Sequence, residues 1–438
     1  MPLPSVCTKM ASLQVSDVIL GNILDSVTLH FSLESYTMSL RGDNMIKKNF
    51  FHKNTFGLVL AGGGTKGAYQ VGVIKALKKL KLPISTVVGT SIGAINGAFM
   101  LQKDFTPLET LYDNLKIDDV MKLTGKVDES KNIFHPSNLL ALLTNIAEQG
   151  GIENAPLREL LEENLNIEEF YQSPVDFGLA TYSVKEKQPL HLFKKEIPKD
   201  KLIDYILASA CFPIFKKQKI GNEEYLDGGL SDNTPINMLV EKGYENIIVA
   251  DIAGIGFHQK MLNKNIYLKI LSPSEDLGGT FEFEQRKIRN NMALGYLDTM
   301  RAFNHLRGNI YYFPLHEFDK LLKYFSLQTI HGLEIAAEFY DIDKYQEYTF
   351  EDFLSLLHEK HTLAQEKYNR IKTALRNSKL PELKKALEND FEKELILCLA
   401  TDLYLENPLS QALSYLKPYL EDEFLTIQAM IEFMHFYK

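Results

Sequence analysis

Residues 56–67 read FGLVLAGGGTKG, and residues 84–93 read ISTVVGTSIG. In both stretches a short apolar, β-branched run passes into glycines and then into a helical pattern, as in a buried strand that feeds a helix. The first of these helices has Val73, Ile74 and Leu77 on one face and four lysines on the other, which we expect to be solvated. Repeated strand–turn–helix units predict an α/β fold with a mostly parallel central sheet.

The same alternation continues to about residue 315, and beyond it only helical patterns remain. We therefore predict an N-terminal extension (1–50), an α/β domain (51–315) and a helical C-terminal region (316–438). Thr234-Pro235 predicts a helix start, and Gly243 its end. The expected strands are Phe56–Leu60, Thr86–Val88, Phe177–Ala180, Ile247–Asp251, Ile266–Leu271 and Ile310–Phe313, and the expected C-terminal helices are Ile330–Phe339, Phe350–His358, Leu363–Leu375 and Leu409–Leu416.

Composition excludes some classes of protein. The chain has 438 residues, a formal net charge of −9 and a pI near 5.7. No excess of Lys and Arg remains to neutralise phosphates, so nucleic acid is not an expected partner. The three cysteines, Cys7, Cys211 and Cys398, are widely spaced and odd in number, which indicates free thiols in a reducing compartment.

Nothing in the sequence predicts a membrane-spanning helix. Residues 82–102 are uncharged and long enough to cross a bilayer. However, they contain Pro83, three glycines and several hydroxyl residues, which favour a buried strand, a turn and a buried helix. Residues 1–44 lack the pattern of a secretory signal. We expect a cytoplasmic or peripheral membrane protein.

The glycines after the first strand suggest an anion site. Gly62, Gly64 and Gly67 satisfy the spacing G-x-G-x-x-G, but no carboxylate follows before Gln102 to hold a ribose, so no dinucleotide is expected. A phosphate-binding P-loop is also disfavoured, because Lys66 is not preceded by glycine. Free N–H groups where a helix begins suit an anion or a developing oxyanion, although the loop alone also fits a tight structural turn.

The second turn is a candidate nucleophile elbow. Gly89-Thr90-Ser91-Ile92-Gly93 follows a strand and opens an apolar helix. Glycines two residues before and after the serine avoid collisions with the flanking backbone, and the turn pushes the hydroxyl outward. The N–H of Ile92 can then donate to a reacting carbonyl oxygen. The alternative interpretation is a glycine-rich turn that serves only packing.

The serine needs a base. None of the eleven histidines, including His191, His258 and His305, lies in a recognisable catalytic setting. Asp227-Gly228-Gly229 is the better candidate, although by itself Asp-Gly is also a common hairpin turn. Taken in order, the glycine loop, the G-x-S-x-G turn and this Asp-Gly-Gly resemble the patatin-like phospholipase family, over about residues 55–255. The stretch from Ala208 to Phe215 is similar to the segment before Asp-Gly-Gly in that family.

This resemblance implies a three-layer domain that cleaves lipid esters with a Ser-Asp dyad and without a metal or cofactor. It implies Ser91 as nucleophile and Asp227 as base, with the N–H groups of Gly62, Gly63 and Gly64 joining that of Ile92 in an oxyanion hole. Lys66 departs from the arginine common in the family and loses its planar fork. The remaining motif positions are Gly67, Gly89, Gly93, Gly228 and Gly229.

The expected partner is a membrane or micellar lipid that the protein contacts peripherally, with or without a protein activator. Lys216, Lys217 and Lys219 are either a cationic rim for anionic headgroups or, as we favour, an ordinary solvated segment. The alternative function is a catalytically silent lipid-binding or scaffold protein on the same fold.

Overall fold

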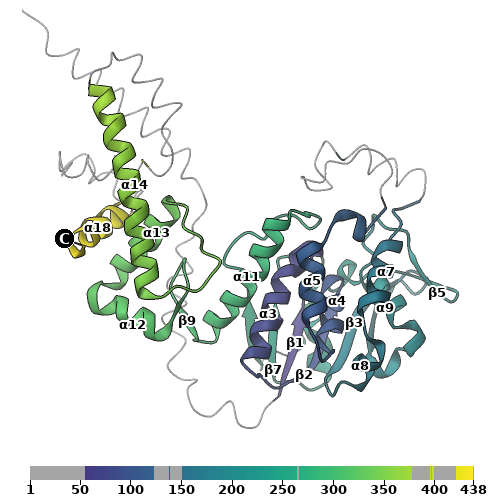
Figure 1. Cartoon of the computed structure of the whole chain (residues 1–438). Coiled ribbons are helices and arrows are strands. Elements are labelled where there is room, and N and C mark those ends of the chain that lie inside the picture. Colours follow the sequence, from purple (N-terminus) through teal and green to yellow (C-terminus); the bar gives the residue numbers. More distant parts are fainter. Residues whose placement is uncertain are drawn as a thin grey trace, which may run out of the picture. The chain divides into compact units, whose positions relative to one another are not determined.

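The computed structural model describes residues 55–122, 138, 150–263, 266–376, 395, 397–398 and 421–437 (Figure 1). These residues belong to one compact unit that runs from Thr55 to Lys438. The predicted N-terminal extension and the predicted helix Leu409–Leu416 lie outside the described residues.

The central sheet confirms the predicted α/β class. Its parallel part has the order β3-β2-β1-β7-β8. These five strands overlap the first five predicted segments, because runs such as Phe56–Leu60 are buried on both faces. Their bounds are β1 Phe56–Leu60, β2 Ile84–Thr90, β3 Asp176–Ser183, β7 Asn246–Ala250 and β8 Tyr267–Leu271.

Three antiparallel strands were not predicted. β4 (Gln188–Phe193) and β6 (Glu223–Asp227) both pair with β3, and β5 (Gln218–Ile220) pairs with β6. They are short and carry many polar or half-exposed residues, so they lack the apolar runs that mark the parallel strands. The prediction of a strand at Ile310–Phe313 was wrong in extent, because only β10 (Phe313–Pro314) forms there, paired with β9 (Leu306–Arg307).

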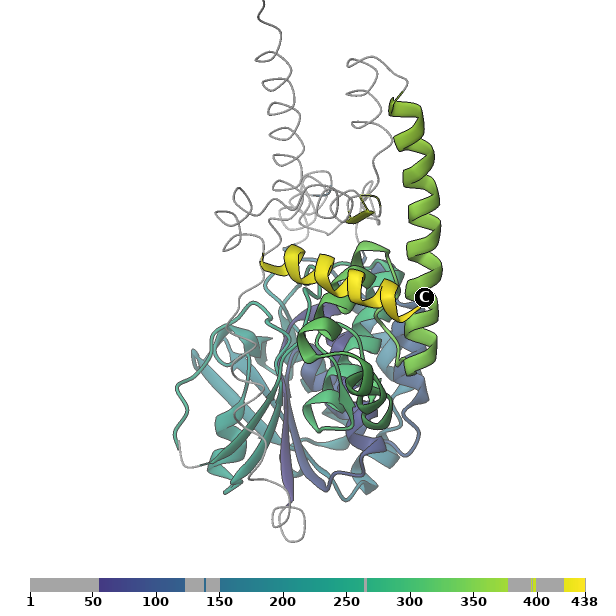
Figure 2. The same cartoon turned by 90° about the vertical axis from the view of Figure 1, so that its left-hand side faces the viewer.

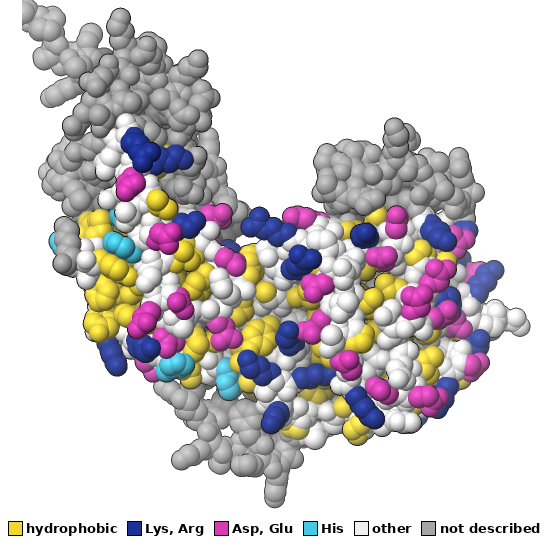
Figure 3. Space-filling model, viewed as in Figure 1, with side chains coloured by type: hydrophobic (Ala, Val, Ile, Leu, Met, Phe, Trp, Pro, Cys, Tyr) yellow, Lys and Arg dark blue, Asp and Glu magenta, His cyan; other side chains and the backbone are white. Residues whose placement is uncertain are grey.

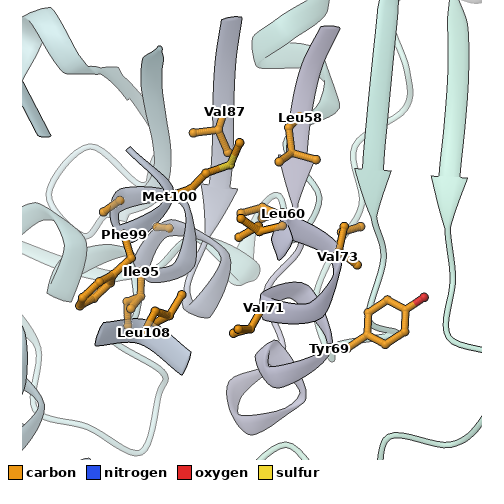
Figure 4. Packing of buried hydrophobic residues seen from close by; sticks show 14 of the residues in the cluster. Leu58, Leu60, Tyr69, Val71, Val73, Val87, Ile95, Phe99, Met100 and Leu108 are labelled. Atoms are coloured by element: carbon orange, nitrogen blue, oxygen red, sulfur yellow. The ribbon is translucent and has the colours of Figure 1, made fainter. Parts of the chain in front are cut away.

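Helices cover the sheet on both faces, and the core residues alternate along each strand. Leu58 and Leu60 of β1 point into the larger core, where α3, α4 and α5 pack (Figure 4). Val59 between them belongs to the smaller core beneath α10. This period of two is that of a strand buried from both sides. The helices of this part are α3 Gly67–Lys79, α4 Ile92–Met100, α5 Thr106–Asn114, α7 Ala155–Asn164, α8 Ile167–Gln172, α9 Leu202–Ser209, α10 Ile236–Glu241 and α11 Gln285–Ala302.

Two details of the predicted helices needed correction. The helix expected to be capped by Thr234 begins at Ile236, because Pro235 has ψ 58°, outside the helical range. The segments predicted as Phe350–His358 and Leu363–Leu375 form one continuous helix, α14 (Phe350–Arg376), since no breaker separates them. The lysine face of α3 is exposed as predicted.

The C-terminal helices build a second core. α13 (Leu327–Phe339) packs against α18 (Glu421–Phe436), where Gly332 lets the helices approach closely (Figure 2). α12 (Leu315–Tyr324) and α14 complete the cluster. Tyr311 and Phe313 are buried in this core, whereas Tyr312 between them is buried in the main core. Residues 311–313 therefore belong to both cores, so the division after residue 315 stays a prediction.

Charges of both signs are interspersed on the face shown in Figure 3. Many charged side chains of the described residues form ion pairs, such as Lys75 with Glu109 at 2.8 Å.

Candidate active site

One strand brings the predicted serine and aspartate together. β2 runs parallel to β3 and ends with Thr90 opposite Ala180. β6 approaches from the opposite direction and ends with Asp227 opposite the next residue of β3, Thr181. The carboxyl ends of β2 and β6 therefore meet at one point on β3, and Ser91 follows directly after Thr90.

Ser91 has the backbone of a nucleophile elbow. Its φ of 55° and ψ of −124° are rarely adopted by a residue with a side chain, so the turn is strained. A Cβ on Gly89 would lie 2.3 Å from the carbonyl of Gly93, and a Cβ on Gly93 would lie 2.0 Å from the carbonyl of Leu60. The predicted steric need for both glycines is therefore visible in the structure.

The Ser209 side chain supports the turn at Ser91 through hydrogen bonds. Its hydroxyl accepts a hydrogen bond from the N–H of Ser91 at 2.9 Å and donates to the carbonyl of Ala180 at 2.7 Å. Ser209 lies at the end of α9, is fully buried and belongs to the Ala-Ser-rich segment noted in the sequence. This hydroxyl ties the serine turn to the point on β3 where the two strands meet.

Asp227 is a buried carboxylate with one oxygen available. Its Oδ1 accepts a hydrogen bond from the N–H of Gly229 at 2.7 Å. Its Oδ2 is buried and has no hydrogen-bond partner among the described residues. Burial raises the pKa of Asp227 from 3.8 to about 6, and the neighbouring Ser91 side chain and the Gly229 N–H offset part of this rise. Such a carboxylate is a stronger base than an exposed one.

The glycine loop lies beside the serine, but its N–H groups are not equivalent. The N–H of Gly62 donates to the carbonyl of Asn233 at 3.0 Å, so Gly62 is not free to bind an oxyanion as predicted. Gly62 instead supplies space, because a Cβ there would lie 2.3 Å from Asn233 Oδ1 and 3.3 Å from Ser91 Cβ. Among the described residues, no acceptor is recorded for the N–H groups of Gly63, Gly64 and Ile92. These three remain candidate oxyanion donors.

Asn233 is a site residue that the sequence did not reveal. Its side-chain amide donates to the carbonyl of Gly62 at 3.2 Å, and its backbone carbonyl accepts from the N–H of Gly62. The side chain is buried and lines the pocket beside Ser91. Asn233 therefore fastens the glycine loop to the segment that carries Asp227. Only its place six residues after the aspartate hinted at this role.

The other motif residues support the backbone. Lys66 Nζ lies 3.4 Å from the carbonyl of Ala253, and Lys66 is not among the residues that line the pocket. Gly67 allows α3 to approach α4, since a Cβ there would lie 2.4 Å from the Ile92 side chain. Gly228 lies against Ala180, where a Cβ would meet the carbonyl oxygen at 2.3 Å.

A deep apolar pocket opens at Ser91 and Asp227. The empty space inside it measures about 930 Å³, including open solvent at its mouth. Its polar side chains are those of Thr65, Ser91, Tyr112, Asp227, Asn233 and Thr280, and most of its remaining wall consists of aliphatic and aromatic side chains. This wall includes Ile95, Phe99, Leu108, Leu111, Leu115, Leu157, Leu160, Phe212, Phe215, Phe281 and Phe283.

The histidines and the three lysines considered from the sequence do not line this pocket. No histidine is among the described residues that line the pocket. Lys216 pairs with Glu153 at 2.5 Å, and Lys217 and Lys219 lie 3.0 and 3.6 Å from Glu224. This favours the solvated reading of the three lysines. The described residues contain no group of three or more His, Cys, Asp or Glu that could hold a metal, and none of their helices is long and apolar enough to cross a bilayer.

Comparison with known proteins gives one consistent family. Residues 58–240 match the model of the patatin-like phospholipase family. Lysophospholipase nte1 of Aspergillus terreus is 55% identical over 200 residues, which are 45% of this chain and 12% of that protein. A patatin-like phospholipase domain-containing protein of Caenorhabditis elegans is 25% identical over 66% of this chain and 21% of its own length. A probable lipid hydrolase of Invertebrate iridescent virus 6 is 26% identical over 42% of this chain and 63% of its own length. The chain thus spans less than two thirds of each relative.

Proposed function

We propose that this protein hydrolyses carboxylic esters of lipids through a Ser91–Asp227 dyad, since residues 58–240 match the model of the patatin-like phospholipase family. The observation that carries the proposal is the meeting of β2 and β6 on β3. It sets a strained, outward-facing serine beside a buried carboxylate at the end of an apolar pocket. Among the described residues that line the pocket, Asp227 is the only carboxylate.

The first half of the reaction forms an acyl-enzyme. As Ser91 Oγ attacks the ester carbonyl carbon, its proton passes to Asp227 Oδ2, the oxygen without another partner. The carbonyl oxygen gains negative charge and receives hydrogen bonds from the N–H groups of Gly63, Gly64 and Ile92. Asp227 then returns the proton to the departing alcohol oxygen as the ester C–O bond breaks.

The second half releases the fatty acid. Water attacks the acyl carbon, Asp227 accepts a proton from the water, and the Ser91–acyl bond breaks as the proton returns to Ser91 Oγ. With a pKa of about 6, Asp227 is mostly ionised near neutral pH, and it accepts the Ser91 proton more readily than a carboxylate with an ordinary pKa. The oxyanion donors must still supply much of the rate, each contributing about 3 kcal/mol.

The pocket supports a long-chain acyl group as the part of the substrate that is recognised. Its wall is aliphatic and aromatic, so it pairs with methylenes rather than with a charged headgroup. One relative is named a lysophospholipase and another a probable lipid hydrolase. We therefore place phospholipids and lysophospholipids first among the substrates to test.

The test is hydrolysis of a short-chain chromogenic ester and of lysophospholipid by the wild type, Ser91→Ala and Asp227→Asn. We expect both variants to lose activity by about a thousandfold or more while remaining folded. Circular dichroism and thermal unfolding verify the fold. Wild-type activity in Ser91→Ala would disprove the dyad, and a wild type inactive on every lipid would favour a silent lipid-binding or scaffold protein.

A further inference from the structure

The loop after β7 exposes large apolar side chains. In this mouth loop (residues 253–262), Ile255, Phe257 and Leu262 are 72%, 68% and 65% exposed. Ile255 also lines the pocket, so the exposed apolar surface continues into the apolar wall beside Ser91. Keeping such side chains in water is unfavourable, and a cluster at the entrance of a site marks an interaction surface.

The exposure is imposed by the site itself. The N–H of Phe257 donates to the carbonyl of Gly229 at 2.9 Å, and the carbonyl of Phe257 accepts from the N–H of Asn233 at 2.6 Å. A Cβ on Gly254 would lie 1.8 Å from the carbonyl of Gly62, so the loop backbone lies directly on the glycine loop. Because the loop backbone contacts Gly229, Asn233 and the glycine loop, the side chains of Ile255 and Phe257 point into solvent.

The charge of this segment differs from that of the whole chain. Residues 252–274 contain Lys260, Lys264, Lys269 and His258 and no Asp or Glu, although the chain has a net charge of −9. Lys260 belongs to the mouth loop and is exposed. Apolar side chains beside cationic ones suit the interface of an anionic bilayer. The apolar side chains enter the boundary between headgroups and acyl chains, and the cationic side chains contact the headgroups.

We propose that the mouth loop is a membrane-docking element: Phe257 and Leu262 insert into a lipid surface, Lys260 contacts its headgroups, and Ile255 continues the apolar path into the pocket. This inference rests on the proposed lipid hydrolase function, and it names the surface through which that site reaches its substrate. Docking in this way turns the pocket mouth toward the bilayer. A lipid chain then enters the pocket without crossing water.

The experiment measures vesicle binding and hydrolysis separately. Binding to phosphatidylcholine–phosphatidylserine vesicles is measured by sedimentation in a Ser91→Ala background, which prevents turnover. Phe257→Ser with Leu262→Ser is compared with Leu363→Ser, a control of similar exposure (55%) on α14, outside the pocket lining. We expect the double variant to bind vesicles at least about tenfold more weakly, since burying one such side chain is worth about tenfold in affinity. Lys260→Glu should weaken binding only when phosphatidylserine is present.

Hydrolysis of a soluble short-chain ester separates docking from catalysis. In the Ser91-containing protein, the double variant should keep this activity and lose hydrolysis of vesicle lipid. Wild-type vesicle binding by the double variant, the same loss in Leu363→Ser, or equal loss on soluble and vesicle substrates would each overturn the docking role. A protein that binds vesicles through the loop but hydrolyses no ester would instead retain the docking surface and reject the proposed hydrolase.

Discussion

At the scale of single residues, the proposed role of Asp227 as base predicts a pH dependence of the activity. Only the ionised carboxylate can accept the Ser91 proton, and burial raises its pKa to about 6. We expect kcat/KM on a soluble ester to rise with pH through about 6 and then level off, measured over about two pH units on either side. An inflection near the ordinary value of 3.8 would contradict the burial effect.

The same burial predicts opposite effects of Asp227→Asn on activity and stability. Since the folded-state pKa lies above the unfolded value, the folded protein binds the proton more tightly, and stability falls as pH rises from about 4 to about 6. Removing the charge should therefore stabilise the fold by about 2–3 kcal/mol near neutral pH, and by little below pH of about 4. Thermal unfolding at both pH values checks this, beside the lost hydrolysis.

Asp232 offers a matched control for the predicted pH dependence of kcat/KM. It is as buried as Asp227, and burial likewise raises its pKa to about 6, but it does not line the pocket. Its carboxylate lies 3.9 Å from His191. Asp232→Asn should leave the inflection in kcat/KM in place. If it removes that inflection, Asp232 is the group that titrates.

At the scale of elements, α4 carries a matched pair of glycines, Gly93 and Gly97. A Cβ on Gly93 would lie 2.0 Å from the carbonyl of Leu60, whereas one on Gly97 would meet only side chains, the nearest at 3.3 Å. Gly93→Ala should cost about 2–3 kcal/mol because backbone must shift. Gly97→Ala should stay within about 1 kcal/mol, since alanine favours the helix and the neighbours must yield only slightly. Chemical denaturation measures both, and equal effects would contradict the contact.

The link between the glycine loop and the segment after β6 depends on Asn233. Asn233→Ala removes the bond to the carbonyl of Gly62. The proposed oxyanion donors would then lose their fixed position, and kcat on a soluble ester should fall about tenfold or more. Asn237→Ala is the control: its buried amide bonds the carbonyl of Lys260 and the N–H of Leu262, and Asn237 does not line the pocket. It should reduce stability and leave kcat unchanged. A similar loss of kcat in both variants would make Asn233 a merely structural residue.

At the scale of the whole molecule, the two cores are joined. Tyr311 and Phe313 enter the C-terminal core, and Tyr312 of the main core donates to Asp298 at 2.8 Å. Lys344 also pairs with Glu275, which follows β8. We expect the described unit to unfold cooperatively. Leu333→Ala, deep in the C-terminal core, should therefore lower the free energy of unfolding by about 2–5 kcal/mol. Ester hydrolysis should be lost in the same unfolding transition as the helices, and so show the same decrease. Hydrolysis that survives the unfolding of the helices would show that the cores are independent.

Sequence analysis succeeded where structure is local. The parallel strands follow from short apolar runs, and the elbow at Ser91 from the two glycines that its turn requires. It failed for β4, β5 and β6, whose polar, half-exposed residues form strands only because they pair with β3 or with each other. It found α10 but placed its first residue one position too early, because the backbone of Pro235 is not helical.

By itself, the sequence determined the α/β class, the turn that projects Ser91 and the family motifs, because sterics and periodicity act over a few neighbouring residues. Only the tertiary structure decided how Asp227 meets Ser91, since β2 and β6 come from distant parts of the chain and converge on β3. It also decided that Asn233 uses the N–H of Gly62, and that the mouth loop exposes Phe257. Those features depend on hydrogen bonds and burial between segments that no local pattern encodes.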